Sequence, residues 1–268
     1  MKSTDIKYIA LVLAVLACLY KCVDGLWSNS ETKTGNSSNY KSKSVKEDII
    51  NINRKGPYLT NDSTALISNC DIENGFLVLY VEYMDFNISV FKENKETTKA
   101  LFYLNSICMD PKQRDTLDNY IENNNLRGLK YVMTDNMKNV VTCELSKEYV
   151  HKMDMEQNSK TYSEKLYNAL VLQTKFEADE SVKLLGHNMI IYLQLDEDSD
   201  EYKYCKSNKR PIAADFLDME DIDIKKLVIK CSVTGCNIIY KIRGINTGTS
   251  FEIKITNKEL QRLVKNNK

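Results

Sequence analysis

Residues 75–91 read GFLVLYVEYMDFNISVF, and this stretch sets the fold that the sequence predicts. It is rich in Val, Ile, Tyr and Phe and begins after the turn-like sequence ENG, a combination typical of a β-strand. Apolar side chains occupy both alternating sets in its first half, so we expect that part of the strand to be buried on both faces. The stretch therefore predicts a β-rich core for the first half of the chain.

Further strand-like stretches occur in both halves of the chain. Several short strands separated by turn signals are typical of β-sandwiches, and two sandwiches of about 110 residues match the usual size of a domain. The predicted fold class is therefore mostly β, with two tandem disulfide-containing β-sandwich domains and one or two short helices. The further predicted strands are residues 98–109, 129–134, 138–145, 165–177, 182–195, 225–231, 236–244 and 250–256.

Composition along the chain predicts five segments. A polar stretch with few apolar residues follows the N-terminal apolar run, and a second polar stretch separates the two β-rich halves. The predicted segments are a signal peptide at 1–25, a flexible arm at 26–44, a first β-sandwich at 45–149, a linker at 150–161 and a second β-sandwich at 162–268.

Two segments are expected to be helical. Asp110 is a good N-cap and Pro111 suits the first helical position. Leu117 and Ile121 then lie four residues apart, which places them on one apolar face. The sequence NKELQRLVK at residues 257–265 predicts a second short helix.

The first 25 residues have the pattern of a secretory signal. A basic start precedes the apolar run Tyr8–Tyr20, and Val23 and Gly25 suit the positions before a cleavage site. The apolar run is too short for a membrane-spanning helix, which needs about 20 residues. The C-terminal sequence KELQRLVKNNK lacks the hydrophobic tail of an anchor signal. We therefore expect a secreted, extracellular protein without direct membrane insertion, retained at a cell surface only through a partner.

The charge balance bears on the choice of partners. The chain has 37 basic and 37 acidic residues, so its formal net charge is zero. A neutral chain lacks the strongly basic character that is typical of nucleic-acid-binding proteins. The sequence therefore predicts protein partners and no nucleic acid.

Six cysteines remain outside the predicted signal, three in each half. Cys231 and Cys236 flank the sequence SVTG, which reads as a hairpin loop, so their sulfurs would face each other across two strands and form a disulfide. Cys205 then has no partner within its own half. Two alternatives stay open: all six cysteines pair internally, or Cys205 forms an interdomain or intermolecular disulfide. The predicted disulfide cysteines are Cys70, Cys108, Cys143, Cys231 and Cys236.

The sequence predicts no catalytic site, no metal site and no cofactor. The two histidines, His151 and His187, fall in the predicted linker and in a turn between strands. No serine has a G-x-S-x-G context, and no phosphate-binding loop is present. The acidic runs at 196–201 and 215–223 lack the order of an EF-hand and are expected to be solvated loops. We therefore expect a protein that is not an enzyme.

Three Asn-x-Ser sequons are predicted glycosylation sites in a host that modifies asparagine. They are Asn36, Asn61 and Asn87. Asn36 falls in the predicted arm, and Asn87 falls in the predicted strand at 75–91, where its side chain would have to point outward.

The signal at 1–25, the two β-rich halves with three cysteines each and the polar C-terminus resemble secreted proteins of the degenerate six-cysteine (s48/45-like) family of malaria parasites. The resemblance implies two s48/45-like β-sandwiches and an adhesive or scaffolding role at the parasite surface. It also implies attachment through a disulfide to a membrane-anchored protein partner, within a surface complex used in host-cell invasion.

The leading functional hypothesis is therefore a secreted, non-catalytic protein-interaction protein, an adhesin or scaffold in a parasite surface complex for host-cell invasion. The alternative is a secreted viral decoy that binds a host cytokine, chemokine or MHC-like protein, since such proteins share the β-sandwich, the disulfides and the missing anchor. A secreted enzyme is a third class, for which the sequence offers no site.

Overall fold

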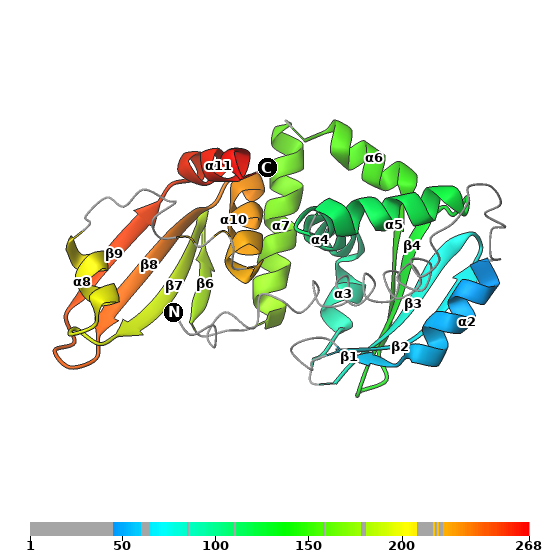
Figure 1. Cartoon of the computed structure of the whole chain (residues 1–268), viewed down its shortest axis with the longest axis horizontal. Coiled ribbons are helices and arrows are strands. Elements are labelled where there is room, and N and C mark those ends of the chain that lie inside the picture. Colours follow the sequence, from blue (N-terminus) through cyan, green and yellow to red (C-terminus); the bar gives the residue numbers. More distant parts are fainter. Residues whose placement is uncertain are drawn as a thin grey trace, which may run out of the picture. The chain divides into compact units, whose positions relative to one another are not determined.

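The chain divides into two compact units with a boundary between Glu156 and Gln157 (Figure 1). This boundary lies inside the predicted linker at 150–161, but most of that segment is helical. The predicted signal peptide and arm lie outside the described residues. A computed structural model describes residues 45–59, 65–84, 86–109, 111–157, 159–177, 181–207, 217, 219 and 222–267.

The first unit is a five-stranded sheet with helices before, between and after its strands. The strand order is β1-β2-β3-β4-β5, with antiparallel hairpins β2–β3 and β4–β5 on either side of a parallel pair β3/β4. A parallel pair requires a crossover, which helices α3 to α5 supply. The elements are α2 (Val45–Lys55), β1 (Tyr58–Leu59), β2 (Ala65–Glu73), β3 (Phe76–Tyr83), α3 (Ser89–Glu93), α4 (Lys95–Ile107), α5 (Pro111–Asn123), β4 (Gly128–Asp135), β5 (Val140–Ser146) and α6 (Lys147–Met155).

The second unit has a four-stranded sheet of the same design. Its strand order is β6-β7-β8-β9, and the central pair β7/β8 is again parallel between two antiparallel hairpins. Helices α8 and α10 lie in the crossover between β7 and β8. The elements are α7 (Lys160–Glu177), β6 (Val182–Leu185), β7 (Asn188–Leu195), α8 (Asp200–Ser207), α10 (Ile222–Thr234), β8 (Asn237–Gly244), β9 (Ser250–Ile255) and α11 (Asn257–Asn266).

The two units also share the register of their central strands. The parallel ladder of the first unit runs from Phe76 opposite Gly128, and that of the second runs from Asn188 opposite Asn237, with eight pairs in each. Aligning these ladders places Tyr80 of β3 with Tyr192 of β7. The same alignment places Tyr131 of β4 with Tyr240 of β8, and both of these tyrosines are buried.

The helix that follows each sheet begins at an equivalent position. Ser146 and Thr256 are the N-caps of α6 and α11, and their side-chain oxygens accept hydrogen bonds from the backbone N–H of Tyr149 and Glu259. In α11 the Glu259 carboxylate also accepts the Thr256 backbone N–H, which completes a capping box. The last strand and last helix of each unit are therefore joined by the same local device.

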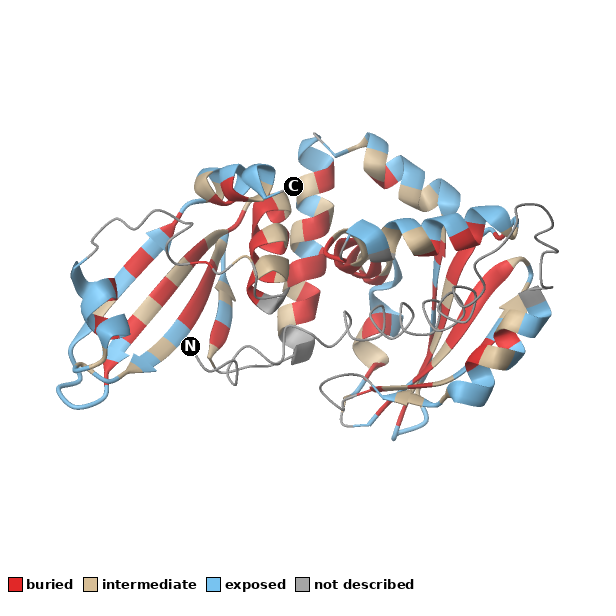
Figure 2. Cartoon of the chain, in the orientation of Figure 1, coloured by how far each residue is buried: buried red, intermediate tan, exposed pale blue. Residues whose placement is uncertain are grey.

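Helices cover one face of each sheet, and this inner face forms the core of its unit (Figure 2). In the first unit the ring of Phe102 on α4 lies 4.4 Å from that of Tyr131 on β4. In the second unit the ring of Tyr202 on α8 meets that of Phe251 on β9 at 5.4 Å. Side chains alternate along each strand between this inner face and an outer face, as strand geometry requires.

The predicted mostly-β class with two tandem disulfide-containing β-sandwiches is wrong, because each unit has a single sheet backed by helices. The described residues contain nine helices in all. Three of the predicted strands are helical: residues 98–109 lie mostly in α4, residues 165–177 lie in α7 and residues 225–231 lie in α10.

The misassigned segment at 225–231 contains strand-favouring residues but has helical spacing. In α10 the buried residues Ile224, Leu227, Val228 and Cys231 repeat every three or four positions, which is the period of a helix face. Burial against the sheet overrides the weak intrinsic preference of Val and Ile for strands.

Other sequence expectations are confirmed. The stretch at 75–91 forms β3, but only as far as Tyr83. The predicted strands at 129–134, 138–145, 182–195, 236–244 and 250–256 correspond to β4, β5, the β6–β7 hairpin, β8 and β9, and the predicted helices are α5 and α11. Among the described residues, no helix is both long and apolar enough to cross a membrane.

A buried or half-buried carboxylate fixes the loop of the last hairpin in each unit. Asp135, at the end of β4, accepts backbone hydrogen bonds from Ile88, Met137 and Asn139. Burial would raise the pKa of Asp135, but these bonds and the Asn139 side chain outweigh burial and lower it.

In the second unit Gly244 takes the place of Asp135, and the carboxylate comes from Glu197 instead. A Cβ at Gly244 would collide with the Glu197 side chain, so the glycine leaves the space that this side chain fills. Glu197 accepts hydrogen bonds from the Thr247 hydroxyl at 2.7 Å and from the backbone N–H groups of Asn246 and Thr247. These bonds lower the pKa of Glu197 to about 2.

We predict that Gly128→Ala destabilises the first unit by roughly 3–4 kcal/mol in urea unfolding, because φ is +144° and a Cβ would strike the backbone of Leu145 and Ser146. Gly186→Ala is the matched control. Its φ is +55° with open space around it, so we expect a loss of only about 1–2 kcal/mol. Equal losses for the two variants would contradict the close approach at Gly128.

We predict that Glu197→Gln lowers the free energy of unfolding at pH 7, and that this deficit shrinks as the pH falls. Folding lowers the pKa of Glu197 from 4.5 to about 2, so its stabilisation is complete above pH 4.5 and is lost as the pH falls toward 2. Urea titrations between pH 7 and pH 3 measure the difference. Asp198→Asn is the control, since the Asp198 carboxylate makes no hydrogen bond in the described structure, and at pH 7 it should unfold at the same urea concentration as the unmodified chain.

Candidate functional site

The six cysteines are buried thiols, and no two of their sulfurs lie at disulfide distance. Burial raises the pKa of the Cys143 thiol to about 12 and also raises those of Cys205 and Cys236. These three sulfurs are therefore protonated and weakly nucleophilic. Cys70, Cys108 and Cys143 belong to the first unit, and Cys205, Cys231 and Cys236 belong to the second.

The predicted hairpin between Cys231 and Cys236 is wrong, because Cys231 lies within α10. The helix ends at Thr234, and Gly235 follows with a φ of 74°. The backbone N–H of Cys236 donates to the Cys231 carbonyl at 3.0 Å. A backbone hydrogen bond that reaches back five residues, next to a glycine in the left-handed conformation, is the Schellman motif that ends a helix. The spacing of the two cysteines thus belongs to a helix terminus, and the two residues do not lie on facing strands.

Cys205, the predicted interdomain or intermolecular cysteine, lies on α8. Its side chain is only 8% exposed. A disulfide from Cys205 to another chain would therefore require α8 to move away from the sheet.

The remaining sequence-predicted positions do not converge on one site. His151 is exposed on α6 and His187 is exposed in the β6–β7 turn, where its ring stacks on that of Tyr167 at 4.2 Å. Asn87 is exposed in the loop before α3 and not in a strand, and its side chain accepts the backbone N–H of Ser89. Asn36 and Asn61 lie outside the described residues. Within the described ranges, no group of three or more His, Cys, Asp or Glu side chains could hold a metal ion.

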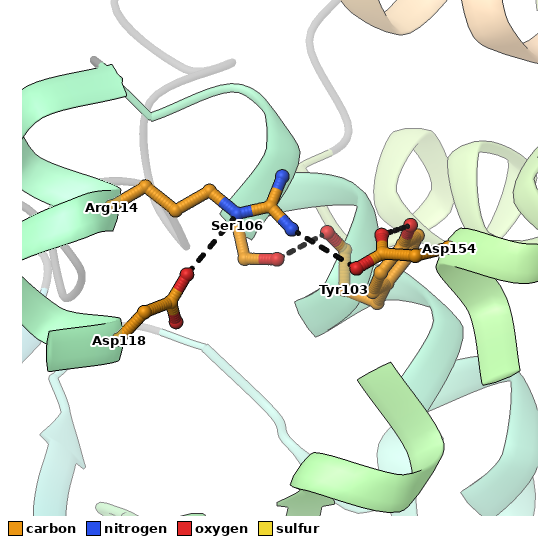
Figure 3. Close-up of polar contacts among 5 residues, drawn as sticks. All are labelled: Tyr103, Ser106, Arg114, Asp118 and Asp154. Atoms are coloured by element: carbon orange, nitrogen blue, oxygen red, sulfur yellow. Dashed lines mark hydrogen bonds and ion pairs between the residues drawn. The ribbon is translucent and has the colours of Figure 1, made fainter. Parts of the chain in front are cut away.

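A polar cluster joins helices α4, α5 and α6 of the first unit (Figure 3). The Tyr103 hydroxyl donates to Asp154 at 2.6 Å, and Arg114 lies 3.5 Å from the other oxygen of Asp154 and 3.7 Å from Asp118. Burial raises the pKa of Asp118, and the guanidinium of Arg114 opposes that shift. Each charged group faces a partner from another turn or helix, so the cluster acts as a clamp between helices.

The outer face of the first sheet carries a network around Tyr80. We define this face as the side chains of Asp71, Glu73, Phe76, Val78, Tyr80, Glu82, Lys130, Val132, Thr134, Val140, Thr142 and Glu144, which point away from the inner face. No described helix covers it, and Phe76 and Val78 within it are buried, so its exposed part lies around Asp71, Glu82, Thr142 and Glu144. The Tyr80 hydroxyl donates a short hydrogen bond to Glu73, and Lys130 lies 3.0 Å from the other Glu73 oxygen.

These contacts set the charges in the network. The hydrogen bonds from Tyr80 and then from Lys130 lower the pKa of Glu73. The same bond to the Glu73 carboxylate raises the pKa of Tyr80 to about 12. Beside the network, the guanidinium of Arg127 lies 4.9 Å from the centre of the Phe76 ring.

The outer face of the second sheet is arranged around Tyr192. We define this face as the side chains of Lys183, Leu185, Asn188, Ile190, Tyr192, Gln194, Asn237, Ile239, Lys241, Arg243, Ser250, Glu252 and Lys254. Again no described helix covers it. The Tyr192 ring is 39% exposed between Lys183 and Lys241, whose ammonium groups lie 5.7 and 5.9 Å from its centre. Lys241 also pairs with Glu252 at 3.1 Å.

In the described part of the chain, the outer faces of the two sheets are arranged in the same way. Each has a tyrosine at the same ladder position, held among charged side chains from neighbouring strands. Sequence reasoning missed these tyrosines, although the alternation of Glu252 and Lys254 with buried Ile253 and Ile255 already marks an outward set on β9. The arrangement can bind a polar partner across a sheet surface.

We predict that Glu73→Gln lowers the pKa of Tyr80 from about 12 toward its usual value of 10, because the neutral amide no longer disfavours the phenolate. Carbon-13 labelling at tyrosine Cζ, followed by an NMR titration, measures this pKa. Glu82→Gln, on the same strand but outside the network, is the control and should leave it in place. An unchanged Tyr80 pKa in Glu73→Gln would show that the two groups do not interact in solution.

The known protein families, the curated proteins and the solved structures contain no match to this chain.

Proposed function

We propose that the chain is an exported, non-catalytic protein-interaction protein that binds its partners through the outer faces of its two sheets. One observation carries the proposal. Each sheet is covered by described helices on one face only, and the other face presents a tyrosine with charged neighbours at the same place in both units.

The chemistry of these faces supports protein binding. Tyrosine supplies a large contact area with a polar end and is enriched at protein interfaces, where it is a frequent hot-spot residue. Tyr192 is held in position by lysines from strands on both sides of it. Tyr80 is held by its bond to Glu73. Side chains that are already ordered lose less conformational entropy on binding.

The other polar groups described above make contacts that stabilise the fold. Their engagement favours a binding function over a catalytic one. Asp135 and Glu197 are occupied with hairpin loops, and Arg114 and Asp154 hold helices together. A nucleophilic site needs an activated group within reach of a base, and burial keeps the thiol of Cys143 protonated.

Export is part of the proposal because residues 1–25 have the pattern of a secretory signal. The invasion-complex role that the six-cysteine resemblance implies depended on two s48/45-like sandwiches. Each unit instead has one sheet backed by helices, so the proposal keeps only the general role of a protein-interaction protein.

Site-specific photo-crosslinking tests this function. A benzoyl-phenylalanine introduced at Tyr80 or Tyr192 should crosslink to a defined extracellular protein, in a manner that excess unlabelled chain competes away. The same group at Arg262, exposed on α11, is the matched control and should give severalfold less product. Equal yields at all three positions would contradict binding through the outer faces.

A further inference from the structure

The outer faces of the two sheets have opposite charge. On the strands of the first sheet four carboxylates face one lysine, and the guanidinium of Arg127 adds a second cation over the ring of Phe76. On the strands of the second sheet four cations face one carboxylate. The charged residues are Asp71, Glu73, Glu82, Glu144 and Lys130 on the first outer face, and Lys183, Lys241, Arg243, Lys254 and Glu252 on the second.

The charges also have the same spacing on the two faces. One row across the first sheet is Asp71–Val78–Lys130–Glu144, with an acid at each end. The equivalent row across the second sheet is Lys183–Ile190–Ile239–Lys254, with a lysine at each end. The ends of both rows are three strands apart, which is about 14 Å. Two such rows placed face to face bring acid to lysine at both ends, whichever way round they meet.

The end residues of these rows are available for binding. Asp71, Glu144, Lys183 and Lys254 are all exposed, and none of them makes an ion pair within the described structure. The lysine inside the acidic row, Lys130, is already neutralised by Glu73 at 3.0 Å.

We infer that the acidic outer face of the first sheet binds the basic outer face of the second sheet of another copy of this chain. The pairing is heterologous, because each copy offers one face of each sign, and repeated contacts of this kind form rings or open chains. The inference rests on the proposed function, since it assigns a partner to the same two faces.

The size of the faces sets the strength of the contact. The second face is the smaller one, because β6, β7, β8 and β9 have four, eight, eight and six residues. At about 3.3 Å per residue and about 4.8 Å between strands it presents roughly 400 Å². Pairing would therefore bury roughly 800 Å² in total, which is less than a standard specific interface buries. Such a contact between charged faces is weak, reversible and sensitive to salt.

Sedimentation velocity of the purified chain over a hundredfold range of concentration tests the inference. We expect the weight-average sedimentation coefficient to rise with concentration in 50 mM NaCl and this rise to disappear in 500 mM NaCl. Lys183→Glu with Lys254→Glu makes both faces acidic, and Asp71→Lys with Glu144→Lys makes both basic. Each variant alone should remain monomeric, and an equimolar mixture of the two should associate.

Lys258→Glu with Lys265→Glu, two exposed positions on α11, is the charge-matched control and should associate like the unmodified chain. Association of the mixture requires both variants to be folded. The single exchange Lys254→Glu disturbs the face less, and we expect it to weaken the association constant at least tenfold. A chain that stays monomeric at all concentrations, a mixture that does not associate, or a control that loses association equally would overturn the inference. A monomeric chain that still crosslinks to a different protein through Tyr192 would overturn it and leave the proposed function standing.

Discussion

Each sheet is built around two parallel strands that no short turn can join. β3 and β4 in the first unit, and β7 and β8 in the second, run in the same direction over eight paired residues. The chain must therefore cross over between them, and the crossover brings helices to one face of the sheet. The inner face becomes the core, and the outer face is left without a described helix. The two outer faces are thus a direct result of how the central strands pair.

The sequence indicates the strands of this fold better than its helices. Alternation and turn residues locate β4, β8 and β9 within a few residues, and Pro111 marks the start of α5. Helix α4 is mistaken for a strand because it is buried on several sides and contains residues that also suit strands. In α4, for example, Ala100 to Asn105 are all buried. A helix that is apolar on most sides gives little amphipathic signal, and length is then the better guide.

The candidate site is harder to foresee because it depends on register. Asp71 and Glu144 are 73 residues apart in sequence and belong to one row only because β2, β3, β4 and β5 pair as they do. Overall composition conceals such faces, since a formal net charge of zero is the sum of regions with opposite sign. The Schellman end at Cys231 and Cys236 shows a similar limit, because two cysteines at that spacing fit a hairpin as well as a helix terminus until the preceding segment is known to be helical.

The burial of the described cysteines determines how fast they can be chemically modified. The six described cysteines lie in the cores of the two units, so an oxidant or alkylating agent in solution reaches them only when a unit opens. The rate of chemical modification then follows the equilibrium of local opening and not the intrinsic reactivity of the thiol. Since each unit holds three of the described cysteines, the fraction of them that is modified would measure separately, for each unit, how often that unit has opened.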